Sequence, residues 1–263
     1  MQPTAAGFFE TCDVAAAPRE LIALGGQLDV DTLVAAYRAG CFPWPNTGPH
    51  GGALERHSRL LVRARQVPLL PGTAPSGPLM PWMSPHPRPV LVPDRVVVSR
   101  SLRKRLRHCG WETTMDQAFD DVIAACAERD ETWIVPEMQA AYRALHRAGW
   151  SHSLEVWSGD ELVGGLYGIL TGRVFAGESM FYRQPDASKV GVVDLCQRLV
   201  EAGVVLIDTQ DESPHMARLG QLLLHREDYL DVLHHFRDDP VTLPTDRRQV
   251  SRLASPLRAG GPE

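Results

Sequence analysis

The sequence predicts an α/β protein in which a meander of antiparallel strands lies between helices. Two observations support this prediction. Segments 153–157 and 162–169 are rich in apolar residues and flank a Ser-Gly-Asp turn, which predicts a β-hairpin. Segment 186–202 instead repeats apolar residues at helical spacing and ends before Gly203, and a short apolar run, 204–208, follows. That pattern predicts a helix followed by a buried strand.

The N-terminal part predicts one clear helix and one long loop. An amphipathic helix is expected within 20–45, with Asp31 as its cap, Gly40 as its end and a buried side of Leu33, Val34 and Tyr37. Segment 46–80 is rich in proline and glycine, which predicts a long, partly disordered loop insertion.

Extended chain is expected next, over 82–93, and then a short strand over 95–98. These features predict a small N-terminal domain, 1–93, and a larger domain, 94–239. The final segment, 240–263, is rich in Pro, Arg and Gly and is expected to be a flexible tail.

The larger domain is expected to contain further helices around the meander. Ser99 should begin a helix that buries Leu102 and Leu106. Further helices are expected over 116–126, 136–145, 216–219 and 226–236, and a third meander strand over 173–177. The expected order of elements is two helices, a meander, a helix and a strand. This is the order found in the acetyltransferase-like (GNAT-type) α/β fold.

Composition excludes several classes of protein. The 263 residues are 44% hydrophobic and 22% charged, as in ordinary globular proteins, and no apolar run is long enough to cross a bilayer. The N-terminus shows no secretory signal. The five cysteines are widely spaced and odd in number, and the ten histidines lack ligand spacing. We therefore expect a cytoplasmic protein with no metal and no membrane partner.

The net charge of −5 argues against nucleic-acid binding over the whole surface. One basic helix face is the exception, and it is either a solvated surface or a contact for RNA phosphates. It consists of Arg100, Arg103, Lys104, Arg105 and Arg107.

Polar side chains at the ends of two short apolar runs are the candidate catalytic residues. Glu178 follows the run 173–176, and Asp208 and Gln210 follow the run 204–207. Alternation along an extended chain places Asp208 and Gln210 on the same side. The alternative is structural: Asp208 caps the next helix and Gln210 bonds a loop.

A series of motifs over most of 24–230 resembles the leucyl/phenylalanyl-tRNA–protein transferases. The resemblance implies transfer of Leu, Phe or Met from aminoacyl-tRNA to the α-amine of proteins that begin with Arg or Lys, which creates an N-degron, without a cofactor. The matching residues include Gly25, Gly26, Phe42, Pro43, Trp44, Ser84, Pro85, Trp133, His152, Ser153, Glu155, Trp157, Gly177, Glu178, Lys189, Asp208, Gln210, His215, Leu219 and Gly220.

The resemblance also implies roles for individual residues. Asp208 and Gln210 would hold the attacking amine, and Glu178 would orient it or bind its cationic side chain. Trp44 and Trp133 would grip the terminal adenosine of the tRNA, whereas without the resemblance core packing is the preferred interpretation of each. The same helix face, Arg100–Arg107, becomes a candidate contact for the acceptor stem. The donor side chain would enter a pocket of Leu166, Phe175, Val192, Leu195 and Ile207, which periodicity alone makes core residues.

Three alternatives have the same scaffold. A CoA-dependent N-acetyltransferase needs a glycine-rich pyrophosphate loop, but segment 182–186 has no glycine and ends in Asp186. An aminoacyl-tRNA-dependent cell-wall peptide transferase differs only in its acceptor. A non-catalytic RNA or protein interaction module would not need Glu178, Asp208 and Gln210. Arg218 and Gln221 also depart from the small residues that are usual in the resembling family.

Overall fold

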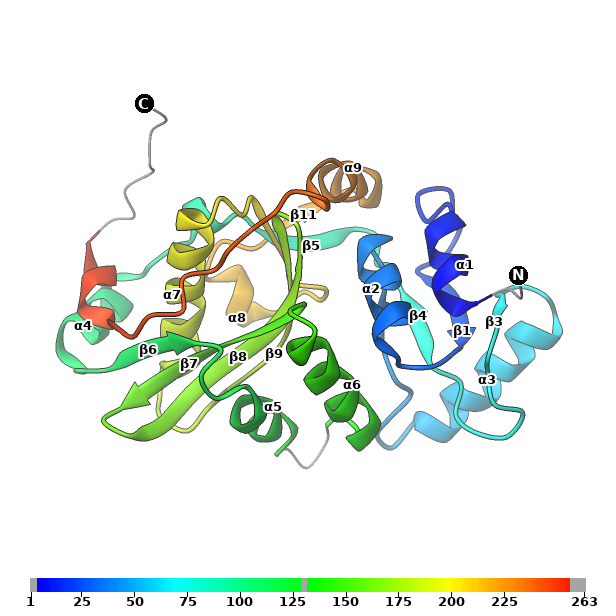
Figure 1. The fold of residues 1–263 in the computed structure, drawn as a ribbon, viewed down its shortest axis with the longest axis horizontal. Helices are drawn as coiled ribbons and strands as arrows, with labels where there is room; N and C mark the ends of the chain where they lie inside the picture. Colours follow the sequence, from blue (N-terminus) through cyan, green and yellow to red (C-terminus); the bar gives the residue numbers. More distant parts are fainter. Residues whose placement is uncertain (1–3, 129–131, 256–263) are drawn as a thin grey trace. The chain divides into compact units, whose positions relative to one another are not determined.

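The computed structural model describes residues 4–128 and 132–255 and shows a mixed α/β protein (Figure 1). The chain forms two compact units. The first consists of 1–88, 127–148 and 224–235, and the second of 89–126, 149–223 and 236–263. Each unit therefore draws on three separate stretches of sequence, whereas the sequence analysis expected two consecutive domains.

The first unit contains a four-stranded sheet in the order β2-β4-β1-β3. β1 pairs with β3 in parallel and with β4 antiparallel. The strands are β1 (Leu21–Gly25), β2 (Phe42–Pro43), β3 (Leu69–Leu70) and β4 (Pro81–Met83), and the helices are α1 (Ala5–Thr11), α2 (Val30–Arg38), α3 (Gly51–Arg63), α6 (Pro136–Arg147) and most of α9 (Arg226–Phe236).

Helix α2 confirms the predicted amphipathic helix but corrects its cap. The Asp29 carboxylate, and not that of Asp31, accepts a hydrogen bond from the Thr32 backbone N–H at 2.8 Å. The helix therefore begins two residues earlier than expected. Leu33 and Tyr37 are buried, whereas Val34 is half-buried.

The prediction of a long loop over 46–80 is wrong for 51–63, which form helix α3. Its prolines all lie outside the helix, at Pro49 and from Pro68 onward, so they interrupt only the flanking chain. An ion pair between Arg59 and Glu55, 2.8 Å long, joins successive turns, and Leu61 packs into the small core of this unit.

The second unit contains an eight-stranded sheet in the order β11-β5-β10-β9-β8-β7-β6-β12. Antiparallel pairing of β7, β8 and β9 confirms the predicted meander. The strands are β5 (Arg88–Leu91), β6 (Glu112–Met115), β7 (Ser151–Ser158), β8 (Glu161–Thr171), β9 (Val174–Tyr182), β10 (Leu206–Asp208), β11 (Leu222–Leu224) and β12 (Arg248–Gln249); the helices are α4 (Arg100–His108), α5 (Phe119–Ala127), α7 (Ala187–Glu201) and α8 (Pro214–Ala217).

Two adjacent glycines of β8 allow helices to approach both faces of this sheet. A Cβ atom on Gly164 would lie 2.7 Å from the Cβ of Ala187 in α7, and one on Gly165 would lie 3.1 Å from Val122 in α5. Successive residues of a strand point to opposite faces. Helices α7 and α5 therefore cover opposite faces of the meander, as can be followed in Figure 1.

The predicted strand over 95–98 is wrong. Residues Pro93–Arg95 form a 3-10 turn, which begins where Pro93 fixes the backbone angle φ, and the strand in this region is β5, which ends at Leu91. Helix α4 confirms the expected cap, because the Ser99 hydroxyl accepts a hydrogen bond from Leu102 N–H at 3.2 Å.

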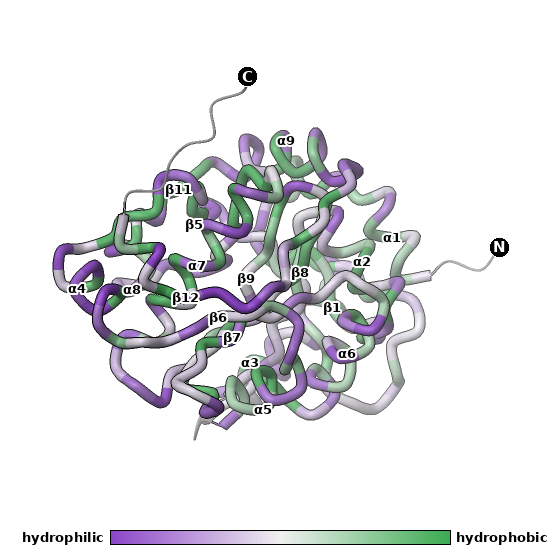
Figure 2. The backbone as a smooth tube through the Cα atoms, turned by 60° about the vertical axis from the view of Figure 1, so that its left-hand side comes forward, coloured by the Kyte–Doolittle hydropathy of each residue, from purple (hydrophilic) through white to green (hydrophobic). Residues whose placement is uncertain are grey.

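The predicted flexible tail is largely ordered where the structure describes it. Arg248 and Gln249 form β12 against β6, and Val250 and Leu253 lie buried in the core beside α4 and α7. The sequence did not indicate this packing because the segment is rich in polar residues, and β12 has the purple colour of hydrophilic residues in Figure 2. The rest of the predicted tail, 256–263, lies outside the described residues.

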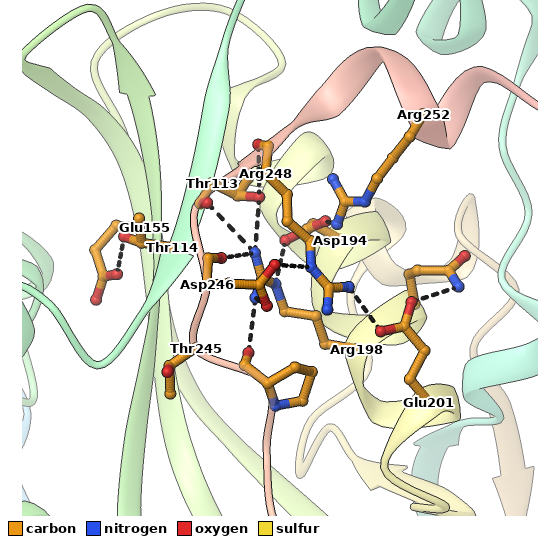
Figure 3. Close-up of polar contacts among 12 residues, drawn as sticks. Thr113, Thr114, Glu155, Asp194, Arg198, Glu201, Thr245, Asp246, Arg248 and Arg252 are labelled. Atoms are coloured by element: carbon orange, nitrogen blue, oxygen red, sulfur yellow. Dashed lines mark hydrogen bonds and ion pairs between the residues drawn. The ribbon is translucent and has the colours of Figure 1, made fainter.

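A buried guanidinium joins this C-terminal segment to α7 (Figure 3). Arg198 has no exposed side-chain surface and donates to the Asp194 carboxylate at 2.8 Å. It also donates to the backbone carbonyls of Pro244, at 2.7 Å, and Asp246, at 2.8 Å. Arg252 bonds the second oxygen of Asp194. These contacts explain why a proline- and arginine-rich segment is held in place.

Candidate active site

Strand pairing brings Glu178 and Gln210 together in the second unit. Strands β9 and β10 run parallel, with Asp208 beside Ala176. Two residues further along each chain, Gln210 therefore comes beside Glu178. The Gln210 side-chain amide donates to a carboxylate oxygen of Glu178 at 2.6 Å. The family resemblance implied that Glu178 acts together with Asp208 and Gln210, and this contact places Glu178 and Gln210 side by side.

Two backbone irregularities aim these side chains. The register between β8 and β9 shifts at Glu178: Gly168 pairs with Gly177, and Tyr167 pairs with Ser179. Such bulges redirect a side chain next to the extra residue. Gln210 has a left-handed backbone with φ of 62°. Neither irregularity follows from apolar periodicity.

Asp208 completes a compact polar group. Its carboxylate accepts a hydrogen bond from the Gln210 backbone N–H at 3.0 Å. Asp208 is 1% exposed, Gln210 5% and Glu178 9%. Two carboxylates and an amide can bind and orient an amine, because carboxylate oxygens accept its N–H hydrogens and attract any positive charge. The alternative role of Asp208 as a helix cap does not occur, because Ser213 caps α8.

The five predicted pocket residues lie in one apolar cluster of the second unit. Phe175 and Ile207 are paired across β9 and β10, and Ile207 directly precedes Asp208 in the chain. All five side chains are buried; they are Leu166, Phe175, Val192, Leu195 and Ile207.

The two predicted adenosine-binding tryptophans meet in the first unit. The rings of Trp44 and Trp133 are nearly parallel, with an interplanar angle of 10° and centroids 6.0 Å apart. Trp44 is 38% exposed, so it is not a core residue. A flat aromatic surface of this kind suits a stacked base.

Helix α4 presents the predicted basic face. Leu102 and Leu106 are buried, and the five basic residues at 100, 103, 104, 105 and 107 are exposed. An open pocket of about 370 Å³ adjoins this face and is lined by Ser101, Lys104, Arg105, His108, Cys109 and Asp186. Asp186 reduces its positive charge, since its carboxylate lies 2.8 Å from the Lys189 ammonium and 3.7 Å from the Arg105 guanidinium.

Comparisons with known proteins identify the family. The model of the leucyl/phenylalanyl-tRNA protein transferase family matches residues 90–234, and that of its N-terminal domain matches 26–52. The chain is 41% identical to the leucyl/phenylalanyl-tRNA–protein transferase of Shewanella oneidensis, over 85% of this chain and 84% of that protein. It is 44% identical to the enzyme of that name from Pseudomonas aeruginosa, over 86% of this chain and 88% of that protein.

The chain belongs to the leucyl/phenylalanyl-tRNA protein transferase family. The resemblance inferred from the motifs is thereby confirmed, and the acetyltransferase, cell-wall and non-catalytic alternatives are not favoured. The match over 90–234 includes Glu178, Asp208 and Gln210, and the N-terminal match includes Trp44. The ordered C-terminal segment, 240–254, lies beyond both matches.

Two other kinds of site are absent from the described residues. Residues 4–128 and 132–255 contain no group of three His, Cys, Asp or Glu side chains placed to hold a metal ion. Within the same residues, no helix is both long and apolar enough to cross a membrane.

A second polar cluster, on β6 and β7, was not expected from the sequence, although Ser153 and Glu155 belong to the family motifs. The buried Glu155 carboxylate accepts hydrogen bonds from the hydroxyls of Ser153 and Thr114. Burial raises the pKa of the Glu155 carboxyl above its ordinary value. Next to it, a ring nitrogen of His152 lies 2.8 Å from the Asp116 carboxylate. This cluster ties β7 to the chain that leads into α5.

Proposed function

We propose that Asp208, Gln210 and Glu178 form the centre at which this aminoacyltransferase positions the α-amine of an acceptor protein. The enzyme moves an amino acid from aminoacyl-tRNA to a protein N-terminus. In our proposal the donors are Leu, Phe and Met, the acceptors begin with Arg or Lys, and the product is an N-degron. The observation that carries the proposal is the 2.6 Å contact between the Gln210 amide and the Glu178 carboxylate, beside Asp208 and the apolar cluster.

The reaction requires positioning more than a strong base. The amine nitrogen attacks the ester carbonyl carbon, the tetrahedral intermediate expels the ribose oxygen, and a peptide bond replaces the ester bond. The amine's proton passes to the departing ribose oxygen or to water. An α-amine with a pKa near ~8 is deprotonated near pH 7 at a cost of about 1.4 kcal/mol. Asp208 therefore orients the amine, and Glu178 balances its charge or that of the acceptor side chain.

The donor is bound by aromatic and apolar surfaces in this proposal. The terminal adenine stacks on Trp44 and Trp133, and the donor side chain contacts Phe175 and Ile207 with the rest of the apolar cluster. An apolar pocket discriminates by about 1–3 kcal/mol per methylene, so it accepts several related side chains. The basic face of α4 contacts acceptor-stem phosphates, which gives affinity without reading sequence.

Two further features belong to this proposal. The order of α5, α6, β7, β8, β9, α7 and β10 supports an acetyltransferase-like topology for the catalytic part. The substrates, a charged tRNA and a protein N-terminus, support a cytoplasmic location.

The proposal predicts transfer from labelled leucyl-tRNA to a peptide that begins with Arg, and little transfer to the same peptide beginning with Ala. Labelled peptide would be measured over time for both acceptors, with acetyl-CoA as an alternative donor. Equal transfer to the two peptides would contradict the acceptor assignment. Binding of acetyl-CoA without binding of leucyl-tRNA would contradict the proposed reaction.

Replacing Trp44 with alanine is expected to weaken donor binding at least about fivefold, because stacking of a base is worth about 1–3 kcal/mol. Turnover of bound donor should change less. Direct titration with leucyl-tRNA and single-turnover transfer measure the two quantities separately. Trp44→Phe keeps a ring and should restore most of the affinity. An unchanged dissociation constant in Trp44→Ala would show that the ring only packs against Phe42 and Trp133.

A further inference from the structure

The left-handed backbone of Gln210 has to be held in place by its surroundings. A residue with a side chain rarely adopts a φ of 62°, and it keeps that conformation only where neighbouring contacts enforce it. The conformation matters because it sets the Gln210 amide against Glu178. The bond from the Gln210 N–H to the Asp208 carboxylate and the 2.6 Å backbone bond from the Asp211 N–H to the Thr209 carbonyl close a tight turn at Gln210, but neither ties this turn to the far end of the loop.

Gln221 adds a side-chain constraint from the far end of the loop. Its side-chain amide nitrogen donates to the Thr209 hydroxyl oxygen at 2.6 Å and to the Asp211 backbone carbonyl at 2.8 Å. These are the residues immediately before and after Gln210. One amide group therefore bridges both flanks of the strained residue.

Both ends of this bridge are anchored. The Thr209 backbone N–H donates to the Pro89 carbonyl at 3.0 Å, and the Gln221 N–H donates to the Met216 carbonyl at 3.1 Å. The Gln221 side-chain oxygen accepts a bond from Ser213 N–H at 3.3 Å. Ser213 in turn caps α8 through a 3.1 Å bond from the Met216 N–H. The loop is thus tied to a neighbouring strand and to a helix.

We infer that Gln221 is a positioning residue for the transfer reaction: it holds the loop 209–213 so that Gln210 faces Glu178. This inference rests on the proposed function. Gln221 acts through Gln210, and its loss should lower turnover and leave substrate affinity almost unchanged. A misplacement of about 1 Å at a reacting group can cost up to ~100-fold in rate.

The test is a double-mutant cycle in the full-length protein. Gln221→Met keeps the side-chain length but removes the donor and the acceptor. It is expected to lower kcat about tenfold or more, with KM for peptide and for leucyl-tRNA within about twofold. In a Gln210→Ala background the same change should alter kcat less than about twofold. An equal loss in both backgrounds, or an unchanged kcat, overturns the inference.

Matched variants separate positioning from loss of fold. Thr209→Val removes one end of the bridge and should also lower kcat. Thr209→Ser keeps the hydroxyl, so its kcat should be close to that of the wild-type protein. Gln197→Met removes a comparable amide, which bonds Glu201 at 2.9 Å on α7, and should leave kcat unchanged. If Thr209→Val and Thr209→Ser have equal kcat, the bridge has no role.

A crystal structure of Gln221→Met gives a readout that does not depend on activity. The Gln210 amide should lie beyond hydrogen-bonding distance of Glu178, and an unmoved Gln210 overturns the inference. Failure of the wild-type protein to transfer leucine would instead overturn the proposed function. The two failures are therefore distinguishable.

Discussion

Replacing Asp208 with alanine is expected to lower amino-acid transfer at least tenfold while leaving the fold and tRNA binding intact. A tenfold loss corresponds to about 1.4 kcal/mol of transition-state stabilisation. The carboxylate is buried and holds the Gln210 backbone N–H, so its removal disturbs both the charge at the site and the amide. Single-turnover transfer from labelled leucyl-tRNA, circular dichroism and tRNA titration would measure the three properties.

Asp208→Asn separates charge from hydrogen bonding, because it retains the oxygen that accepts the Gln210 bond. If the charge orients the amine, this variant should be nearly as slow as Asp208→Ala. Asp211→Asn is the matched control, since Asp211 is an exposed carboxylate three residues further along the loop. Equal activity of wild type and Asp208→Ala would remove Asp208 from the mechanism.

Replacing Arg198 with alanine is expected to lower the free energy of unfolding by about 3–5 kcal/mol, because one partner of a buried ion pair is left without its counter-charge. Asp194 is fully buried and would retain only Arg252. The carbonyls of Pro244 and Asp246 would also lose their donor. Urea unfolding followed by circular dichroism would measure the loss.

Two comparison variants make this prediction specific. Arg248→Ala removes an arginine that is partly exposed and paired with Glu201 and Asp246, and it should cost only about 0–1 kcal/mol. The double change Asp194→Leu with Arg198→Met should recover part of the stability, because it leaves no unpaired buried charge. A loss for Arg198→Ala no larger than that for Arg248→Ala would contradict the assigned role.

Periodicity and turn chemistry were sufficient for the elements whose stabilising contacts are local. The boundaries of α9 were predicted, and so were the Ser99 cap of α4 and the turn between β7 and β8. The association of Glu178 with Gln210 was expected only from the family resemblance, because the contact joins residues 32 positions apart in the sequence. For α9, the Ser99 cap and the turn between β7 and β8, the pattern and the contact lie within the same short stretch of chain.

The features that the sequence did not predict depend on contacts between residues that are distant in sequence. Helix α3 was missed because the surrounding prolines outweighed its amphipathic pattern. The order in 240–254 comes from Arg198, some 46 residues away in sequence. The bridge from Gln221 to Thr209 spans 12 residues of irregular chain, which carries no periodic signal.

The Arg198 contacts also impose an order of events during synthesis. The ribosome adds Asp194 and Arg198 well before the Pro244 and Asp246 carbonyls that Arg198 bonds. Until those residues emerge, the Arg198 guanidinium lacks two of its hydrogen-bond acceptors and must stay hydrated. Val250 and Leu253 also cannot yet fill the core. A nascent chain halted near residue 239 should therefore be protease-sensitive around α7, although every residue of the polar centre has already been made.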